Sequence, residues 1–205
     1  MMTGSMMTGQ ETGPDDQPPP DGTGQGTALR CHLAAGLFAE IPEITEDMEA
    51  RPDRDEAALG FVRKLLASPT PEEAVTFMAQ LFTRRVAVWW GHECLRHLER
   101  HLDPQDLEMM ALCADWVACP DEPHRLHLMR ALEASAMRSP GVWLAMAAGW
   151  SGGSLAPPDS PVVAPPRFLT GRGVNAAVLS ALARVPRADR QETLETFIVM
   201  AHDLV

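Results

Sequence analysis

Three side chains able to bind a metal ion recur at helical spacing near the middle of the chain: Cys94, His97 and His101. At 100° per residue, an α-helix places them within an arc of about 60°, an arrangement that suits three ligands of a zinc ion. The residues between them do not match the helical zinc-protease motif, in which two histidines stand four apart around a glutamate. Cys94 also falls in line with Trp90 and Leu98, so burial of the thiol in the core is the competing interpretation.

A second set of metal-binding residue types follows, with Cys113 and Cys119 upstream of His124 and His127. No Cys-x-x-Cys or His-x-x-x-His pair connects them, so their spacing gives a metal site little support. No serine lies in a nucleophile-elbow context. Paired acids such as those at 121–122 stand at helix starts, where they interact favourably with the helix dipole. The sequence therefore predicts a protein that is not an enzyme and has no catalytic residue, no metal and no cofactor.

The elements that carry these residues are predicted to be helices. Apolar residues make up 45% of the 205 residues, but aromatic residues only 5%, with no Tyr, a composition that favours helix packing over a sheet sandwich. Helix-start signals occur at Thr70, Asp103 and Ser139, each followed by proline. The positions four, seven, eight and eleven residues after each start are apolar: Ala74, Phe77, Met78, Leu81, Leu107, Met110, Ala111, Ala114, Trp143, Met146, Ala147 and Trp150.

The three starts are spaced 33 and 36 residues apart, close to the length of a two-helix hairpin. A repeat of αα-hairpins and a set of ordinary capped amphipathic helices explain this pattern equally well. Further helices are predicted near 55–67, 83–102 and 121–138, and two more after residue 174. The predicted fold is all-α, an antiparallel helical bundle or short solenoid of αα-hairpins with seven or eight helices.

The domain organisation is predicted from composition. Residues 1–27 consist mainly of polar residues, Gly and Pro, with little to bury, and are expected to form a disordered tail. Residues 28–205 are expected to form a single helical domain. Within it, the proline-rich stretch 151–171 can be neither helix nor central strand, and we expect a long extended loop. Its apolar residues predict that the loop is anchored on a surface: Leu155, Val162, Val163, Phe168 and Leu169.

A partner surface is predicted where this loop and an adjacent pair of tryptophans offer apolar groups. Adjacent helical residues point about 100° apart, so one of the two tryptophans is expected in a groove or under a loop. Aromatic faces pack well against polyproline, which makes the loop an attractive neighbour, whereas burial of both rings in the core is the alternative. The residues of the predicted partner surface are Trp89, Trp90, Leu155, Pro157, Pro158, Pro165, Pro166 and Phe168.

The charge of the chain limits its partners. A net charge of −11, with no Lys/Arg stripe to offset it, disfavours nucleic acid and anionic membrane surfaces. No apolar run is long enough for a signal peptide or a membrane span, and the four cysteines show no disulfide spacing, so a cytoplasmic location with reduced thiols is expected. The oligomeric state is left open.

Three segments carry a resemblance to a known family. They are Ala-Val-Trp-Trp at 87–90 with the Glu-Cys pair at 93–94, the run 131–148 that contains Ser-Pro-Gly-Val-Trp, and the proline-rich segment 153–171. Over residues 55–205 the chain resembles an uncharacterised bacterial family of helical proteins. Members of that family tend to be encoded beside type VI secretion and related contractile injection genes, near spike-tip and adaptor components. The resemblance implies an adaptor or chaperone role and carries over no catalytic residue.

The sequence thus predicts a cytoplasmic, non-enzymatic interaction protein, an adaptor or chaperone for a secretion effector or spike component. A metal-binding helical enzyme or sensor using Cys94, His97 and His101 is a second hypothesis. A third is an immunity protein or antitoxin that neutralises a basic partner through the acidic stretch 40–56.

Overall fold

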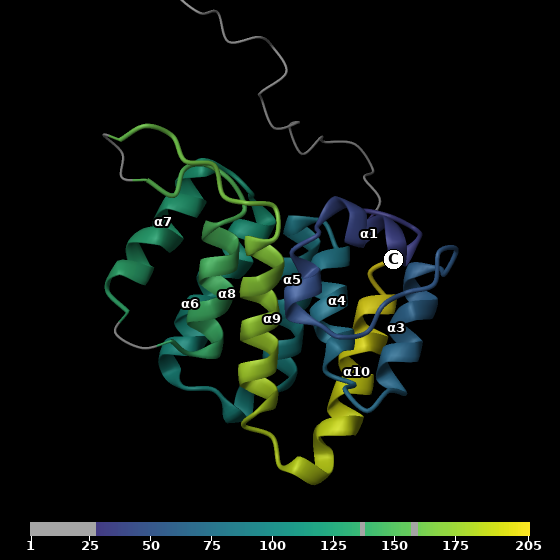
Figure 1. Ribbon diagram of the computed structural model, residues 1–205. Helices are drawn as coiled ribbons and strands as arrows, with labels where there is room; N and C mark the ends of the chain where they lie inside the picture. The colour runs from purple at the N-terminus through teal and green to yellow at the C-terminus, as the bar shows by residue number, and fades with distance from the viewer. Residues whose placement is uncertain (1–27, 136–137, 157–159) are drawn as a thin grey trace, which may run out of the picture.

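The computed structural model describes residues 28–135, 138–156 and 160–205 (Figure 1). Over these residues the protein has ten α-helices and no strand, which confirms the predicted all-α class. The helix count exceeds the predicted seven or eight, and the short helix expected from the apolar run 29–41 is followed by a second one at 44–47. The predicted tail, residues 1–27, lies outside the described residues.

The helices run in the following order: α1 (Ala34–Glu40), α2 (Ile44–Asp47), α3 (Ala58–Leu66), α4 (Glu73–Leu81), α5 (Arg84–His97), α6 (Pro104–Ala118), α7 (Glu122–Glu133), α8 (Pro140–Gly149), α9 (Leu169–Leu182) and α10 (Arg190–His202). Short 3₁₀ turns follow α5 at Glu99–His101 and precede α10 at Arg187–Asp189. No helix in these described ranges is long and apolar enough to cross a membrane.

Two of the three predicted helix starts are confirmed. Helix α6 begins at Pro104 after Asp103, and α8 begins at Pro140 after Ser139. In both, the proline takes a position whose amide would have no helical acceptor, and its fixed φ suits the first turn. Helix α4 begins later than predicted, at Glu73, because residues 71–72 form a turn in which the Glu73 amide donates to the Thr70 carbonyl.

The predicted apolar stripe holds for α4 and fails for α6 and α8. All four predicted positions of α4 are buried, whereas Leu107 of α6 is 37% exposed and the polar Asp106 is fully buried in its place. Helix α8 buries residues on every side, including Val142, Leu144 and Ala145, so a single stripe cannot describe it. A helix packed on several neighbours needs apolar residues all round.

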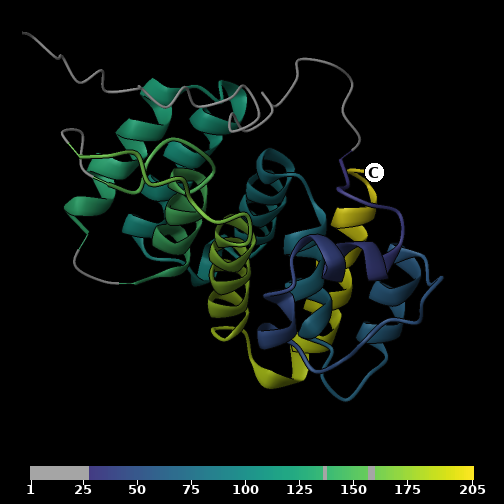
Figure 2. The same ribbon diagram turned by 45° about the horizontal axis from the view of Figure 1, so that its top comes forward.

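Helix α9 lies at the centre of the molecule. It packs against α8, α5 and α4, and both views place it between the α6, α7 and α8 group and the group that contains α3, α4 and α10 (Figures 1 and 2). Its contact with α8 is close, since a Cβ added at Gly173 would lie 2.8 Å from the Cβ of Ala147. Because α9 packs against both groups of helices, the chain segment that comes directly before α9 is held in place at the point where it enters the helix.

A buried carboxylate joins three of these helices. The Asp106 side chain is 0% exposed and accepts hydrogen bonds from the Gly141 amide (2.8 Å) and the Asp103 amide (3.2 Å). It also pairs with Nη1 of Arg184, just after α9, at 3.0 Å. Helix α8 approaches so closely here that a Cβ added at Gly141 would lie 2.6 Å from the Asp106 Cα. One side chain thus sets the start of α6, the start of α8 and the end of α9.

Candidate functional site

The loop between α8 and α9, residues 151–168, is the candidate functional site, and we call it the proline loop. It was predicted to run to residue 171, but residues 169–171 form the first turn of α9, where the Arg172 amide donates to the Phe168 carbonyl at 2.9 Å. Its described residues, 151–156 and 160–168, contain no helix or strand. Pro165 is buried and Pro166 is exposed, while Pro157 and Pro158 lie outside the described residues.

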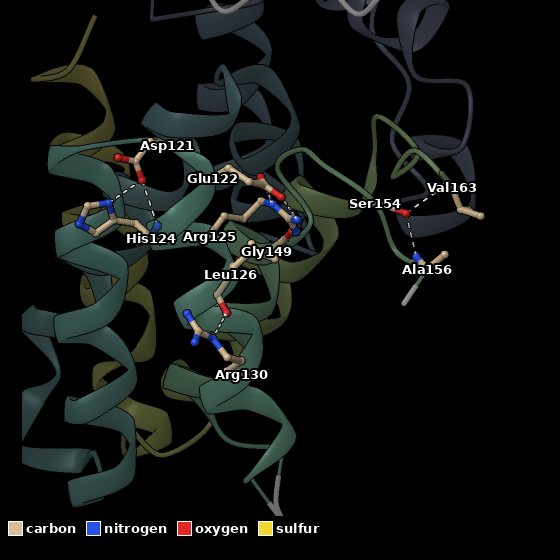
Figure 3. A network of polar contacts seen from close by, with 10 residues as sticks. All are labelled: Asp121, Glu122, His124, Arg125, Leu126, Arg130, Gly149, Ser154, Ala156 and Val163. Atoms are coloured by element: carbon tan, nitrogen blue, oxygen red, sulfur yellow. Dashed lines mark hydrogen bonds and ion pairs between the residues drawn. The ribbon is translucent and has the colours of Figure 1, made fainter. Parts of the chain in front are cut away.

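Two arginines hold the start of the proline loop. Arg125 of α7 is only 4% exposed, and its Nη1 donates to the Gly149 carbonyl at 2.9 Å (Figure 3). Arg84 at the start of α5 donates from Nη1 to the Ser151 carbonyl at 2.8 Å. Carbonyls at the C-terminal end of a helix lack helical donors and carry partial negative charge, so Arg125 satisfies the end of α8, while Arg84 holds the first residue of the loop.

Arg125 is itself held by an ion pair within α7. Its Nε and Nη2 donate to the two carboxylate oxygens of Glu122 at 2.7 and 2.6 Å (Figure 3). The hydrogen bonds from Arg125 keep the pKa of Glu122 below its usual value, against the opposing effect of burial. Planar two-point pairing of this kind fixes the orientation of the guanidinium as well as its position.

Gly153 allows the proline loop to turn over this guanidinium. Its φ of 65° lies in the left-handed region, which glycine adopts without steric cost. A Cβ added at Gly153 would also lie 2.7 Å from Nε of Arg125. Both the backbone conformation and the available space therefore require glycine at this position.

Hydrogen bonds from backbone amides join the two limbs of the proline loop near its tip. The Ser154 hydroxyl oxygen accepts from the amides of Ala156 and Val163, each at 3.0 Å (Figure 3). The Leu155 amide donates to the Val163 carbonyl at 2.8 Å. Two of these bonds cross the loop, because they join Val163 to Ser154 and Leu155, nine and eight positions away in the chain, so the limbs hold one another in place.

The end of the proline loop is held against α4 and α9. The Gln80 side-chain amide donates to the Phe168 carbonyl at 3.0 Å, and the Arg172 guanidinium lies over the Phe168 ring, 4.4 Å from its centroid. Arg167 pairs with Glu40 at 3.5 Å. Phe168 is therefore half-buried within the protein's own packing, and the free apolar surface of the loop lies elsewhere.

Three aliphatic side chains of the proline loop face solvent, and we call them the loop surface. Leu155 is 37% exposed, Val162 79% and Val163 51%. Large apolar side chains scattered singly over a surface are ordinary, whereas three exposed ones on the described part of one loop form a small apolar patch. Of the predicted partner residues, Leu155 belongs to this surface, and Val162 and Val163 are additions that the structure makes.

The two tryptophans lie apart from the loop surface. Trp90 is 0% exposed, and its indole Nε1 donates to the Phe197 carbonyl of α10 at 2.9 Å, which makes it a core residue. Trp89 is half-buried and stacks on the His92 ring, with centroids 5.2 Å apart and planes 7° from parallel. Trp90 thus fills the core, as in the alternative prediction, and its burial leaves it out of a partner's reach.

The predicted ligand trio Cys94, His97 and His101 is not brought together. Helix α5 ends at His97, and His101 lies in the following 3₁₀ turn, so the helical spacing that would align the three residues does not extend to it. Cys94 is fully buried, and loss of water contact raises the pKa of its thiol well above the usual value. His97 instead lines a shallow polar pocket of about 280 Å³ with Arg100 and Glu192.

A different trio does come together where α6 turns into α7. In the described part of the chain, the ligand atoms of Cys119, Asp121 and His124 all lie within 4.8 Å of one another. Asp121 Oδ1 accepts from the His124 amide at 3.0 Å and lies 2.6 Å from Nδ1 of its ring, while the Cys119 thiol donates to Oδ2 at 3.1 Å. The backbone bond and then the ring bond from His124 lower the pKa of Asp121 to about 2. Cys113, which the sequence grouped with Cys119, His124 and His127, is buried in the core.

The acidic stretch 40–56 is largely neutralised within the protein. Arg172 of α9 pairs with Asp47 at 2.7 Å and Glu46 at 2.9 Å. Glu40 pairs with Arg30 at 3.5 Å, in addition to its pair with Arg167. These acids hold α9 and the N-terminal segment together, so the stretch has fewer free carboxylates for a basic partner than its sequence suggests.

Sequence reasoning missed the arginines that hold the proline loop. Arg84 and Arg125 lie 67 and 24 residues from the carbonyls that they bind, and only the fold brings these positions together. One local signal was available, because Glu122 and Arg125 stand three apart at a predicted helix start. This spacing does not show whether the arginine is buried and reaches another helix or forms an ordinary ion pair on the surface.

These observations define an all-α protein whose central helix is preceded by an anchored loop with an exposed apolar surface. A family model described as "Family of unknown function (DUF6931)" matches residues 61–205, which include α4 to α10 and the whole proline loop, and the chain belongs to this family. No curated protein and no solved structure matches the chain.

Replacing Arg125 with Met is expected to loosen the start of the proline loop while leaving the helices intact. The change keeps an unbranched, flexible side chain but removes the donor to Gly149 and the ion pair with Glu122, with an expected loss of about 2 kcal/mol in the free energy of unfolding. Limited proteolysis should cut within the proline loop several times faster than in the unsubstituted protein. Arg130→Met is the matched control, since Arg130 is exposed on the same helix and bonds only locally, to the Leu126 carbonyl (Figure 3). Equal cleavage rates in the two variants would contradict this role of Arg125.

Proposed function

We propose that this protein is a non-enzymatic interaction protein that binds a protein partner through the loop surface, Leu155, Val162 and Val163. The observation that carries the proposal is that exposed aliphatic side chains stand on a loop whose backbone is fixed at its start, near its tip and at its end. Exposed apolar side chains gain free energy when a partner removes them from water.

The anchoring of the proline loop supports binding for an energetic reason. Ordering the backbone of a flexible segment costs roughly 1 to 2 kcal/mol per residue. Loop residues that the fold already holds in place do not lose this freedom again when a partner binds, so more of the apolar contact energy contributes to affinity. Prolines at 161, 165 and 166 reduce the freedom of the unbound loop further.

The partner that we propose is a component or effector of a contractile, type VI-like secretion system, with this protein as its adaptor or chaperone. This part of the proposal is supported by the sequence resemblance alone. The loop surface is compatible with it, because an adaptor needs a binding surface and no reacting group.

The test is a double substitution, Val162→Asp with Val163→Asp, in the full chain. Both side chains are exposed, so the variant should keep its helix content and its free energy of unfolding within about 0.5 kcal/mol. Affinity purification from the native host with quantitative mass spectrometry should identify a partner that the double variant loses. The purified partner should then bind the variant at least tenfold more weakly in a titration, since charges placed in an apolar interface are left without water.

Val199→Asp supplies the matched control. Val199 is 60% exposed on α10, so the substitution places the same charge on an aliphatic residue outside the proline loop. This variant should bind the partner as the unsubstituted protein does. Equal binding by the loop double variant and the unsubstituted protein would contradict the proposal, as would an equal loss in the α10 variant.

A further inference from the structure

Cys119, Asp121 and His124 form a cluster that the proposed function does not use. Their sulfur, carboxylate oxygen and ring nitrogen lie within 4.8 Å of one another at the turn from α6 to α7. We propose that this cluster is a zinc(II) site with three protein ligands and one position left for water or an exogenous ligand.

The donor set matches zinc chemistry. A thiolate, a carboxylate and a neutral imidazole are the three ligand types that zinc takes in proteins, and the two anions balance the charge of the ion. In a tetrahedral site the ligand atoms stand about 3.3 to 3.6 Å apart. The present separations are 2.6 Å for His124 Nδ1 to Asp121 Oδ1 and 3.1 Å for Cys119 Sγ to Asp121 Oδ2. Small side-chain rotations would lengthen these two contacts enough for the ion to enter. The ion would then replace the protons of the two hydrogen bonds.

The backbone that carries the ligands is already fixed. The Cys119 amide donates to the Asp115 carbonyl at the end of α6, and the Asp121 amide donates to the Cys119 carbonyl at 2.8 Å. Pro120 and Pro123 restrict φ on either side of Asp121. Cys119 and Asp121 therefore stand on a short turn and His124 in the first turn of α7, and this backbone loses little freedom when an ion binds.

The electrostatic setting also suits a cation. Helix α6 ends at Ala118, directly before Cys119, so the negative end of its dipole meets the cluster. Helix α7 begins at Glu122 and directs the positive end of its dipole towards the same place, which opposes the first effect. The carboxylate of Asp121 and the thiolate of Cys119 supply two negative charges, which outweigh the single positive charge of the nearby Arg85 guanidinium. Cys119 and Asp121 are exposed, which gives a metal ion free entry.

Zinc binding by the tag-free full chain tests the proposal directly. Titration with zinc chloride against a chromophoric chelator should show one ion bound per chain. Cys119→Ser and His124→Ala should each weaken binding by about tenfold or more, because a lost ligand costs at least as much as a lost outer-shell partner. Asp121 is left unchanged, because its carboxylate also caps α7 and its loss would confuse binding with folding. Circular dichroism of each variant should match that of the unsubstituted protein.

Cobalt(II) substitution identifies the sulfur ligand. The unsubstituted protein should give a thiolate-to-cobalt charge-transfer band together with the intense visible bands of tetrahedral cobalt. The Cys119→Ser variant should lose the charge-transfer band. His127→Ala is the matched control, since His127 lies three residues further along α7, is exposed and stands outside the trio. Less than one zinc per chain, an unchanged cobalt spectrum in Cys119→Ser, or an equal loss of affinity in His127→Ala would overturn the site.

Discussion

Asp106→Ala is expected to lower the free energy of unfolding by about 3 kcal/mol, a large part of the stability of a domain of this size. The substitution leaves the buried amide of Gly141 and the part-buried amide of Asp103 without their acceptor. It also removes the ion pair to Arg184, whose side chain is 31% exposed and so loses less than a buried cation would. The effect is large because one carboxylate serves three helices.

Chemical denaturation followed by circular dichroism measures this loss. Glu108→Ala, on the exposed side of the same helix, is the control and should change the free energy of unfolding by no more than about 0.5 kcal/mol. A loss of less than 1 kcal/mol in Asp106→Ala would mean that water replaces the carboxylate at the helix junction, and that the buried network does not organise the fold.

Gly141→Ala is expected to destabilise the protein by about 2 kcal/mol or more, although the same change in a helix normally stabilises by about 1 kcal/mol. The reversal of sign follows from the close approach of α8 to α6. The new Cβ would lie 2.6 Å from the Asp106 Cα, and backbone atoms cannot move aside as a flexible side chain can. The shift of α8 would also lengthen the hydrogen bond from the Gly141 amide to the Asp106 carboxylate.

Gly152→Ala is the matched control for this prediction, because a Cβ added at Gly152 meets no atom within 4 Å. It should leave the free energy of unfolding unchanged or raise it by a few tenths of a kcal/mol, through lower freedom of the unfolded chain. Similar unfolding curves for the two glycine variants would show that α8 can move away from α6 without cost, which the packing argument excludes.

Much of the helical content followed from local signals in the sequence. The caps at Asp103 and Ser139 marked the starts of α6 and α8 correctly, because capping depends on residues within one turn. Asp121 caps α7 in the same way, accepting a hydrogen bond from the His124 amide. The end of α5 was set too late, since no local breaker separates His97 from the 3₁₀ turn that follows.

The buried faces were harder to predict for a physical reason. Spacing identifies a core face only when a helix has one apolar side, as α4 does. Helix α8 is surrounded by α6, α7 and α9, so its apolar residues carry no directional information. In α6, the buried Asp106 breaks the expected rule that charged residues face water, and its partners come from two other helices.

The candidate site likewise has one part that the local sequence predicts and another part that depends on the fold. The proline-rich composition predicted a loop between two helices, because proline restricts the backbone wherever it occurs. The apolar residues predicted an anchored loop, but the main anchors are polar: Arg84, Arg125 and Gln80, which act on backbone carbonyls distant in the chain. Contacts of that kind leave no periodic trace in a sequence.

By itself, then, the sequence determined the all-α class, most helix starts and the position of the proline loop, since these depend on propensity, capping and proline geometry over a few residues. Only the tertiary structure decided which side chains meet. It placed Trp90 in the core, left Val162 and Val163 exposed, and separated Cys94 from His101. It also brought Cys119, Asp121 and His124 together, because the turn between α6 and α7 directs three side chains of different helix ends to one point, and helical spacing cannot describe a turn.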